Sequence, residues 1–204
     1  MKLFYAPTTI SIASAIALDE AGIDYEPVRV DFASGEQTKP SFHAINPKGR
    51  VPALITEQGI LTETGAILDY IAAIKPAAHL VPSDPWQAAQ MRAVMYYLAS
   101  TMHVNHAHRL RGIRWVDKES SIEDMKAKVP QTMTESARFI NDHAIRTPFV
   151  MGDVISIADP YLFVVCSWLE GDGVKVDDFP KIVAFRDAME ARPSVKKARE
   201  MGML

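Results

Sequence analysis

The chain has 204 residues, a formal net charge of −3 at pH 7 and a sequence pI near 6.1. This length supports one large or two small domains with a substantial core, and the lack of a basic excess argues against nucleic acid as a partner. No stretch approaches the roughly 18 consecutive apolar residues of a membrane helix and the first residues do not look like a signal peptide, so we expect a cytoplasmic protein without membrane contacts.

The first 75 residues predict alternating strands and helices. Residues 2–5 and 25–30 are short apolar or aromatic runs typical of strands, and apolar residues between them recur at helical spacing until Gly22. A second, short helix is predicted around residues 36–44. Two strands then flank a hairpin turn at residues 57–59, and an apolar stripe over residues 67–74 predicts a third helix. The order βαβαββα is that of a thioredoxin-like α/β domain.

Three prolines, Pro76, Pro82 and Pro85, mark a domain boundary because no continuous helix can include them all. We expect a first domain over residues 1–76, a linker over 77–85 and an all-helical domain over 86–204. The helical patterns of the second domain cover residues 86–111, 122–145, 156–169 and 180–192, with a last short piece after Pro193.

Two features of the helical half predict structural roles. Ser156 and Asp159 have the spacing of a capping box, in which Ser156 accepts from the N–H of Asp159 and the Asp159 side chain returns the bond. Pro160 is compatible with the first turn of that helix. The single cysteine, Cys166, excludes an intrachain disulfide and lies in an apolar run, so we expect a buried, unreactive thiol.

The run from Asn46 to Leu54 predicts a strand edge that can bind an extended peptide. Pro52 opens the strand and removes one ladder donor, which leaves the backbone of Val51 free to pair with a ligand. Val51 offers both its N–H and its C=O if the Val51-Pro52 bond is cis. Glu63 and Thr64 follow at the start of the third helix, where backbone N–H groups favour a carboxylate.

These motifs, with Met1–Pro7 at the start and Ser156–Pro160 in the helical half, make the chain resemble the cytosolic glutathione S-transferases. The resemblance spans essentially the whole sequence and is closest to the bacterial beta class and related enzymes. It implies that the first domain binds glutathione as a co-substrate, with no metal. It also implies that the helical domain forms the site for a small, mostly hydrophobic electrophile, and that the protein is a homodimer.

The loop after the first strand carries the groups that would hold the glutathione sulfur as a thiolate. The beta class has a cysteine in this loop, but the matching position here is Ile10, which then lines the second-substrate site. A hydroxyl mechanism is therefore implied. Thr9 matches the serine of the delta class and Ser11 that of the phi class, and Ser11 is preferred. The alternative is that Ser11 only caps the helix and Thr9 only completes a turn.

For glutathione itself, the resemblance assigns the cysteinyl backbone contacts to Val51, with Pro52 fixing the bend. It assigns the γ-glutamyl ammonium to Glu63 and the γ-glutamyl carboxylate to Thr64. These residue types suit the charges they would meet. The lysine that reads the glycyl carboxylate in the beta class has no clean match. Lys39, or with less support His43, is the candidate, and a solvated surface lysine is the alternative.

Three histidines on the first long helix of the second domain are further candidates. His103 has the spacing of a histidine that lines the beta-class active site, and His106 follows one turn later on the same face. We place both in the second-substrate site and expect His108 on an exposed face. A metal site is not favoured, because no carboxylate or cysteine lies beside them at a ligand spacing.

Three functional hypotheses follow. The first is a glutathione transferase, the second a non-catalytic binding or scaffold protein of the same fold, and the third a glutathione-dependent isomerase or dehalogenase. Loss of the loop cysteine supports the second hypothesis, and the retained Val51-Pro52 and Glu63-Thr64 oppose it. A homodimer is expected because the first long helix of the second domain carries more apolar and aromatic residues, such as Met91, Met95 and Tyr96, than one buried helix face requires.

Overall fold

The computed structural model describes all 204 residues, in two compact units. The first unit comprises Met1–Ser83 together with Met189–Leu204, and the second comprises Asp84–Ala188. Each unit has its own buried core.

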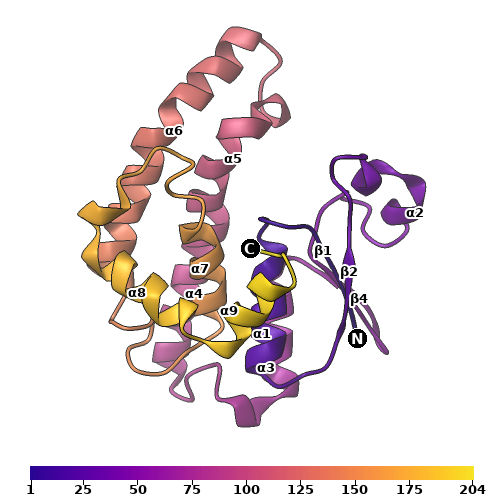
Figure 1. Ribbon diagram of the computed structural model, residues 1–204, viewed down its shortest axis with the longest axis vertical. Coiled ribbons are helices and arrows are strands. Elements are labelled where there is room, and N and C mark those ends of the chain that lie inside the picture. Colours follow the sequence, from indigo (N-terminus) through magenta and orange to yellow (C-terminus); the bar gives the residue numbers. More distant parts are fainter. The chain divides into compact units, whose positions relative to one another are not determined.

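A four-stranded sheet forms the centre of the first unit (Figure 1). Its strands are β1 (Lys2–Tyr5), β2 (Glu26–Arg29), β3 (Ala53–Thr56) and β4 (Gly59–Thr62), in the order β2-β1-β3-β4. β1 runs parallel to β2 and antiparallel to β3, and β3 forms a hairpin with β4. Leu3 and Leu54, which are paired across β1 and β3, are fully buried.

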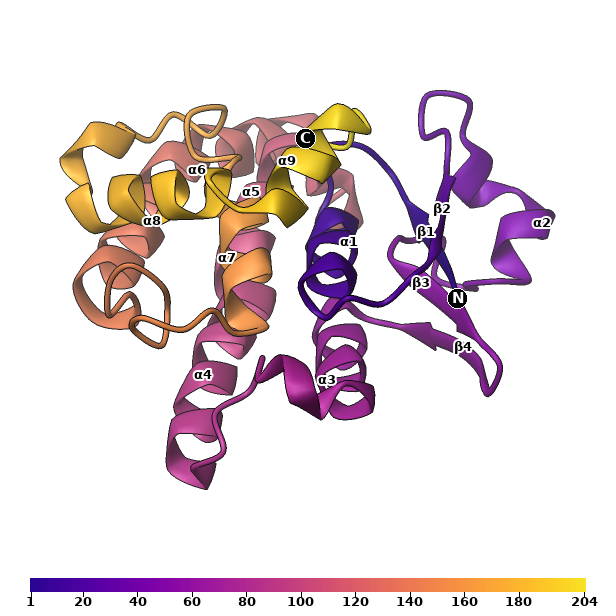
Figure 2. The same ribbon diagram turned by 60° about the horizontal axis from the view of Figure 1, so that its bottom comes forward.

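Helices α1 (Ser11–Glu20) and α3 (Thr64–Ile74) lie on one side of this sheet, and α2 (Pro40–His43) lies on the other (Figure 2). A 3₁₀ turn, Glu36–Thr38, precedes α2, and another, Pro76–Ala78, follows α3. The predicted order βαβαββα and the thioredoxin-like fold are confirmed. The predicted second helix is shorter than expected, because its first half is the 3₁₀ turn.

Helix α9 (Pro193–Glu200) belongs to the first unit. Arg192 makes a two-pronged ion pair with Glu20 at 2.5 and 2.6 Å, and Lys197 pairs with Asp19 at 2.6 Å, so both bonds join α9 to the end of α1. Ser194 also donates to Glu20. The structure thus differs from the expected 86–204 domain at its end, because helical periodicity does not reveal against which core a helix packs.

The second unit is all-helical, as predicted. It contains α4 (Pro85–Tyr97), α5 (His103–Arg111), α6 (Glu119–Phe139), α7 (Ala158–Cys166) and most of α8 (Pro180–Glu190). A π-helical segment, Leu98–Met102, separates α4 from α5 within the single helix expected there, and a second, Ile140–Ala144, follows α6. α5 and α6 lie side by side (Figure 1). None of the helices of the chain is both long and apolar enough to cross a membrane.

Asp159 organises the start of α7 from a fully buried position. Its carboxylate accepts from the N–H of Val150 at 2.7 Å and from both the N–H and the hydroxyl of Ser156, at 2.7 and 2.8 Å. The predicted return bond from Asp159 is confirmed. The other half of the predicted capping box is wrong, because the Ser156 hydroxyl donates to the carboxylate, and the Asp159 N–H bonds to the Ser156 carbonyl instead.

Candidate functional site

The loop between β1 and α1 is held by a residue near the other end of the sequence. Thr8 adopts a left-handed conformation with φ 58°, and its N–H donates to the carbonyl of Met203 at 2.8 Å. The N–H groups of Thr9 and Ile10 make no hydrogen bond within the chain. They lie at the start of α1, where unpaired N–H groups favour an anion.

Two hydroxyls of this loop bond to each other. Thr9 Oγ1 lies 2.6 Å from Ser11 Oγ and donates to the Ala6 carbonyl at 2.8 Å, while Ser11 Oγ accepts from the Ala6 N–H at 3.2 Å. Each hydroxyl has one proton, so both protons have acceptors inside the loop. Ser11 is fully buried, whereas Thr9 is partly exposed. Ser11 does not cap α1, which begins without a side-chain cap.

The segment before β3 leaves the backbone of Val51 unpaired. The Val51-Pro52 bond is cis, and neither the N–H nor the C=O of Val51 makes a hydrogen bond within the chain. The preceding turn is fixed by Asn46, whose side-chain amide donates to the Arg50 carbonyl at 2.6 Å. Gly49 has φ 62°, and a Cβ there would lie 3.0 Å from the Gln37 carbonyl, so this position requires glycine.

Glu63 and Thr64 stand at the junction of β4 and α3. Glu63 has φ 72°, and its carboxylate, with 68% of the side chain exposed, accepts from Lys48 Nζ at 2.5 Å. Lys48 Nζ also donates to Thr62 Oγ1 at 2.8 Å. Thr64 is buried as the first residue of α3. Lys48 was not predicted as a site residue, although its charge inside the Asn46–Leu54 run was a usable signal.

The strand register brings these motifs together. Phe4 pairs with Ala53, and Ala53 pairs with Thr62. The loop after β1, the segment before β3 and the junction after β4 therefore all leave the sheet at the same end. Lys39 precedes α2 with an exposed side chain that makes no hydrogen bond or ion pair within the chain. His43 is nearer to the edge motif, because its Nε2 would lie 3.3 Å from a Cβ at Gly49.

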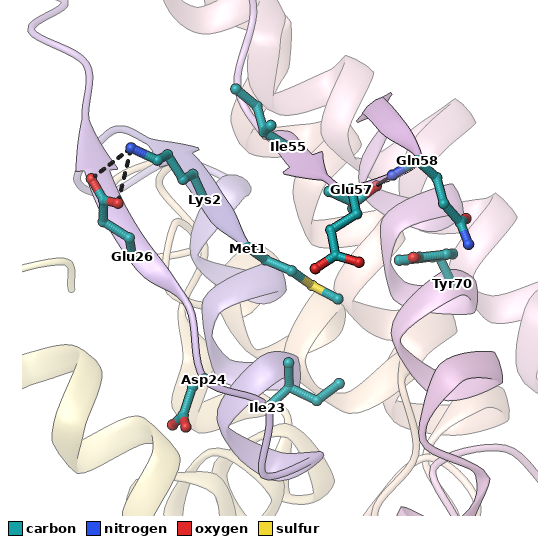
Figure 3. A pocket seen from close by; sticks show the side chains of 10 residues that line it. Met1, Lys2, Ile23, Asp24, Glu26, Ile55, Glu57, Gln58 and Tyr70 are labelled. Atoms are coloured by element: carbon teal, nitrogen blue, oxygen red, sulfur yellow. Dashed lines mark hydrogen bonds and ion pairs between the residues drawn. The ribbon is translucent and has the colours of Figure 1, made fainter.

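A cavity of about 620 Å³ lies at the opposite end of the sheet (Figure 3). It is open to solvent and bordered by the Lys2–Glu26 ion pair at the start of β1 and β2, and by Glu57 and Tyr70. None of the predicted site residues lines it. Its position excludes it from the site formed by the loop motifs.

In the second unit, His103 and His106 lie near each other and against Trp168. The His106 ring stacks on the indole with centroids 4.2 Å apart, and the His103 ring lies 5.0 Å from it. His108 instead contacts Trp115, 4.7 Å away. His108 lies apart from the other two, but it is half-buried, so the expected exposed face is only partly present. Ile10, the remaining candidate for the second-substrate site, is buried in the first unit.

Sequence reasoning missed the residues that orient His106. Its Nδ1 lies 2.7 Å from Oδ2 of Asp172, and Arg109 donates from Nη1 to Oδ1 of the same carboxylate at 3.1 Å. Asp172 is fully buried between them. The Gly171-Asp172-Gly173 turn is a signal for an unusual backbone, but nothing in the sequence relates it to α5. No group of three or more His, Cys, Asp or Glu side chains could hold a metal ion.

Family models match both parts of the chain. Residues 1–73 match the glutathione S-transferase N-terminal domain, and residues 114–200 match the glutathione S-transferase C-terminal domain. The chain belongs to the glutathione S-transferase family. It is 31% identical to glutathione S-transferase GstA of Escherichia coli O157:H7, over 97% of this chain and 96% of that protein.

Other relatives of the family differ in their named activities. The chain is 31% identical to a maleylacetoacetate isomerase of Pseudomonas aeruginosa, over 97% of this chain and 95% of that protein. Among solved structures, a glutathione transferase homologue from Sulfitobacter with bound glutathione is 60% identical, with a TM-score of 0.98 over 100% of this chain and 98% of that one. The resemblance to bacterial glutathione transferases is thereby confirmed.

Proposed function

We propose that the protein is a glutathione transferase that joins the glutathione thiolate to small, mostly hydrophobic electrophiles. The observation that carries this proposal is the convergence of three motifs at one end of the sheet, where the backbone of Val51 is unpaired. The Sulfitobacter homologue with bound glutathione supports it, because the two chains share most of their residues.

Glutathione would add to the first unit as an extended peptide. Its cysteinyl N–H and C=O would pair with the C=O and N–H of Val51, next to Pro52. Glu63 would bind the γ-glutamyl ammonium, and Thr64 with the adjacent N–H groups of α3 would bind the carboxylate. Lys48 forms an ion pair with the Glu63 carboxylate. When glutathione binds, its ammonium would either bind the same carboxylate together with Lys48 or replace Lys48 there.

The glycyl carboxylate would be bound by Lys39, whose side chain has no partner within the chain, or by His43 beside the edge motif. Each is a single side chain at an exposed position, so each would contribute little affinity. No metal ion takes part in the proposed binding mode.

The thiolate would be stabilised at the start of α1. Lowering a thiol pKa by about two units requires roughly 2.7 kcal/mol of preferential stabilisation of the anion. The unpaired N–H groups of Thr9 and Ile10 and one hydroxyl together have that magnitude. We now favour Thr9 over Ser11 as the hydroxyl donor, because Thr9 is partly exposed and Ser11 is fully buried and accepts from Ala6. Thr9 would turn its proton from the Ala6 carbonyl to the sulfur.

A glutathione-dependent isomerase is the second candidate, since the Pseudomonas aeruginosa relative named as an isomerase is as similar as GstA. A dehalogenase would also need a glutathione thiolate, whereas a scaffold protein would not need to ionise the glutathione thiol. The deciding experiment measures ultraviolet thiolate absorbance of bound glutathione against pH, followed by turnover of an aryl halide. Binding without a lowered thiol pKa would support the scaffold, and a lowered pKa without conjugation would support the isomerase.

We also propose a homodimer. Trp86 and Tyr96 on α4 have exposed fractions of 71% and 68%, which is unusual for large apolar side chains in a monomer. A two-fold axis would let such residues bury against the same surface of a second copy. Sedimentation at micromolar concentration giving only the 22.6 kDa species would contradict this proposal. The cytoplasmic location stays a prediction.

A further inference from the structure

A buried carboxylate in the second unit holds two side chains of α5 that can carry positive charge. Asp172 is fully buried, and its two oxygens are used separately: Oδ2 by Nδ1 of His106 at 2.7 Å and Oδ1 by Nη1 of Arg109 at 3.1 Å. A carboxylate needs only one cation to be neutralised. Arg109 alone supplies that cation, so the cluster of His106, Arg109 and Asp172 carries no net negative charge.

The positions of both side chains are fixed by their surroundings. The indole of Trp168 covers one face of the His106 ring, with 19° between the planes. A Cβ at Gly171 would lie 2.7 Å from Nη1 of Arg109, so a side chain at residue 171 would displace the guanidinium from its present position. A ligand binding to these groups would therefore lose little side-chain entropy.

Both side chains keep unused hydrogen-bonding groups. Arg109 uses Nη1 alone, so its Nε and Nη2 groups have no partner within the chain, and neither has Nε2 of His106. The side chains are 32% and 24% exposed, respectively. The Nε and Nη2 groups form an edge that matches the two oxygens of a carboxylate, which a lysine ammonium cannot do.

We propose that His106 and Arg109 bind a carboxylate of the second substrate, so that the electrophile is an organic acid. This inference rests on the proposed transferase function and names the substrate class for it. Arg109 would make two parallel bonds to the carboxylate, and His106 would contact it through Nε2. Asp172 is a positioning residue, because it orients both donors from the buried side.

The competing explanation is that the cluster only fastens the turn at Asp172 to α5. Such a structural role would affect all substrates equally. A carboxylate site would instead distinguish an acid from a neutral compound of the same shape. The test therefore compares matched ligands as well as matched variants.

The experiment uses a chloronitrobenzoate and the corresponding chloronitrobenzamide as electrophiles for the glutathione-saturated protein. Each kcat/KM is divided by the uncatalysed rate, since the two compounds differ in intrinsic reactivity. We expect the wild type to favour the acid by roughly ten- to a hundredfold, the range of one charge-assisted bidentate contact. Arg109→Lys keeps a cation beside the buried Asp172 but removes the paired Nε and Nη2 donors, and it should raise KM for the acid about tenfold and KM for the amide by much less.

Two further variants complete the design. Asp172→Asn should raise KM for the acid much more than KM for the amide, whereas a structural role would lower activity with both to the same extent. His108→Gln, on the same helix but outside the cluster, should leave the preference intact. Equal corrected rates for acid and amide in the wild type, or a full preference in Arg109→Lys, would overturn the proposal.

Calorimetric titration with benzoate and benzamide separates this inference from the proposed function. If neither electrophile is conjugated, the transferase function fails, but benzoate should still bind more tightly than benzamide and Arg109→Lys should remove the difference. If conjugation occurs and benzoate binds no better than benzamide, the carboxylate site fails while the transferase function stands.

Discussion

Ser11 Oγ and Thr9 Oγ1 lie 2.6 Å apart, and both bond to the backbone of Ala6. Ser11 accepts from the Ala6 N–H and lies 3.4 Å from the Ala6 carbonyl, to which Thr9 donates at 2.8 Å. The two hydroxyls therefore hold the loop between β1 and α1 together by bonds to each other and to Ala6. One hydroxyl supports the loop from the buried side, and the other remains near solvent.

The first prediction separates these two hydroxyls. Thr9→Ala should raise the pKa of bound glutathione and lower aryl halide turnover by roughly ten- to a thousandfold, as expected for loss of one directed donor. Thr9→Ser retains the hydroxyl and should retain most activity. Ser11→Ala leaves the buried Ala6 N–H without its acceptor and should cost about 1–3 kcal/mol in the free energy of unfolding. A larger rise of the thiol pKa in Ser11→Ala would return the catalytic role to Ser11.

The second prediction concerns glutathione binding. Glu63→Gln and Thr64→Ala should each weaken retention on immobilised glutathione, because each removes a charge-assisted or helix-start contact. Glu57→Gln is the matched control, since Glu57 borders the cavity at the far end of the sheet. Unchanged retention of the Glu63→Gln, Thr64→Ala double variant would refute the assigned site.

The third prediction concerns Asp159. Asp159→Ala should lower the free energy of unfolding by about 3 kcal/mol or more, because it leaves the N–H groups of Val150 and Ser156 buried without an acceptor. Denaturant titration followed by circular dichroism measures this loss. Asp153→Ala, in the exposed part of the same segment, should change stability by less than about 0.5 kcal/mol. Equal effects of the two variants would contradict the buried role.

The fourth prediction concerns pH. Burial raises the pKa of the Cys166 thiol from 9.0 to about 12, because the apolar surroundings disfavour the thiolate. The unfolded chain ionises this thiol more readily, so the stabilising contribution is complete below pH 9 and is lost as the pH rises toward 12. Cys166→Ala should show a smaller alkaline loss of stability. At pH 8 the native protein should resist maleimide labelling and the denatured protein should react; rapid native labelling would show an accessible thiol.

Local patterns were sufficient to predict the first unit's strands and helices. The hairpin at residues 57–59 and the stripe at residues 67–74 each depend on neighbours in the sequence, and both are present. Interruptions within a helix were not predicted, since the expected helix over 86–111 contains the π-helical segment Leu98–Met102. A π segment depends on packing against other helices, which periodicity does not describe.

Contacts between distant residues could not be predicted. The bond of His106 to Asp172 joins α5 to a turn far along the chain, and the ion pair of Glu20 with Arg192 joins α1 to α9. The direction of neighbouring side chains could not be predicted either, because the sequence does not show that Ser11 is buried and Thr9 is partly exposed. The positions of the motifs along the sheet were therefore predictable, while the burial and contacts that distinguish neighbouring hydroxyls and cations needed the structure.

The bond from Thr8 to the Met203 carbonyl has a consequence for synthesis on the ribosome. Residues at the N-terminus emerge first, and domains usually fold in that order. Here the loop after β1 gains its last support, and α1 gains α9, only after the whole second unit has been translated. Until then, the surface of the first unit that binds α9 stays exposed to solvent. When translation is stalled within α8 (Pro180–Glu190), we therefore expect the nascent first unit to be cleaved by proteases at Thr8 more readily than the released protein.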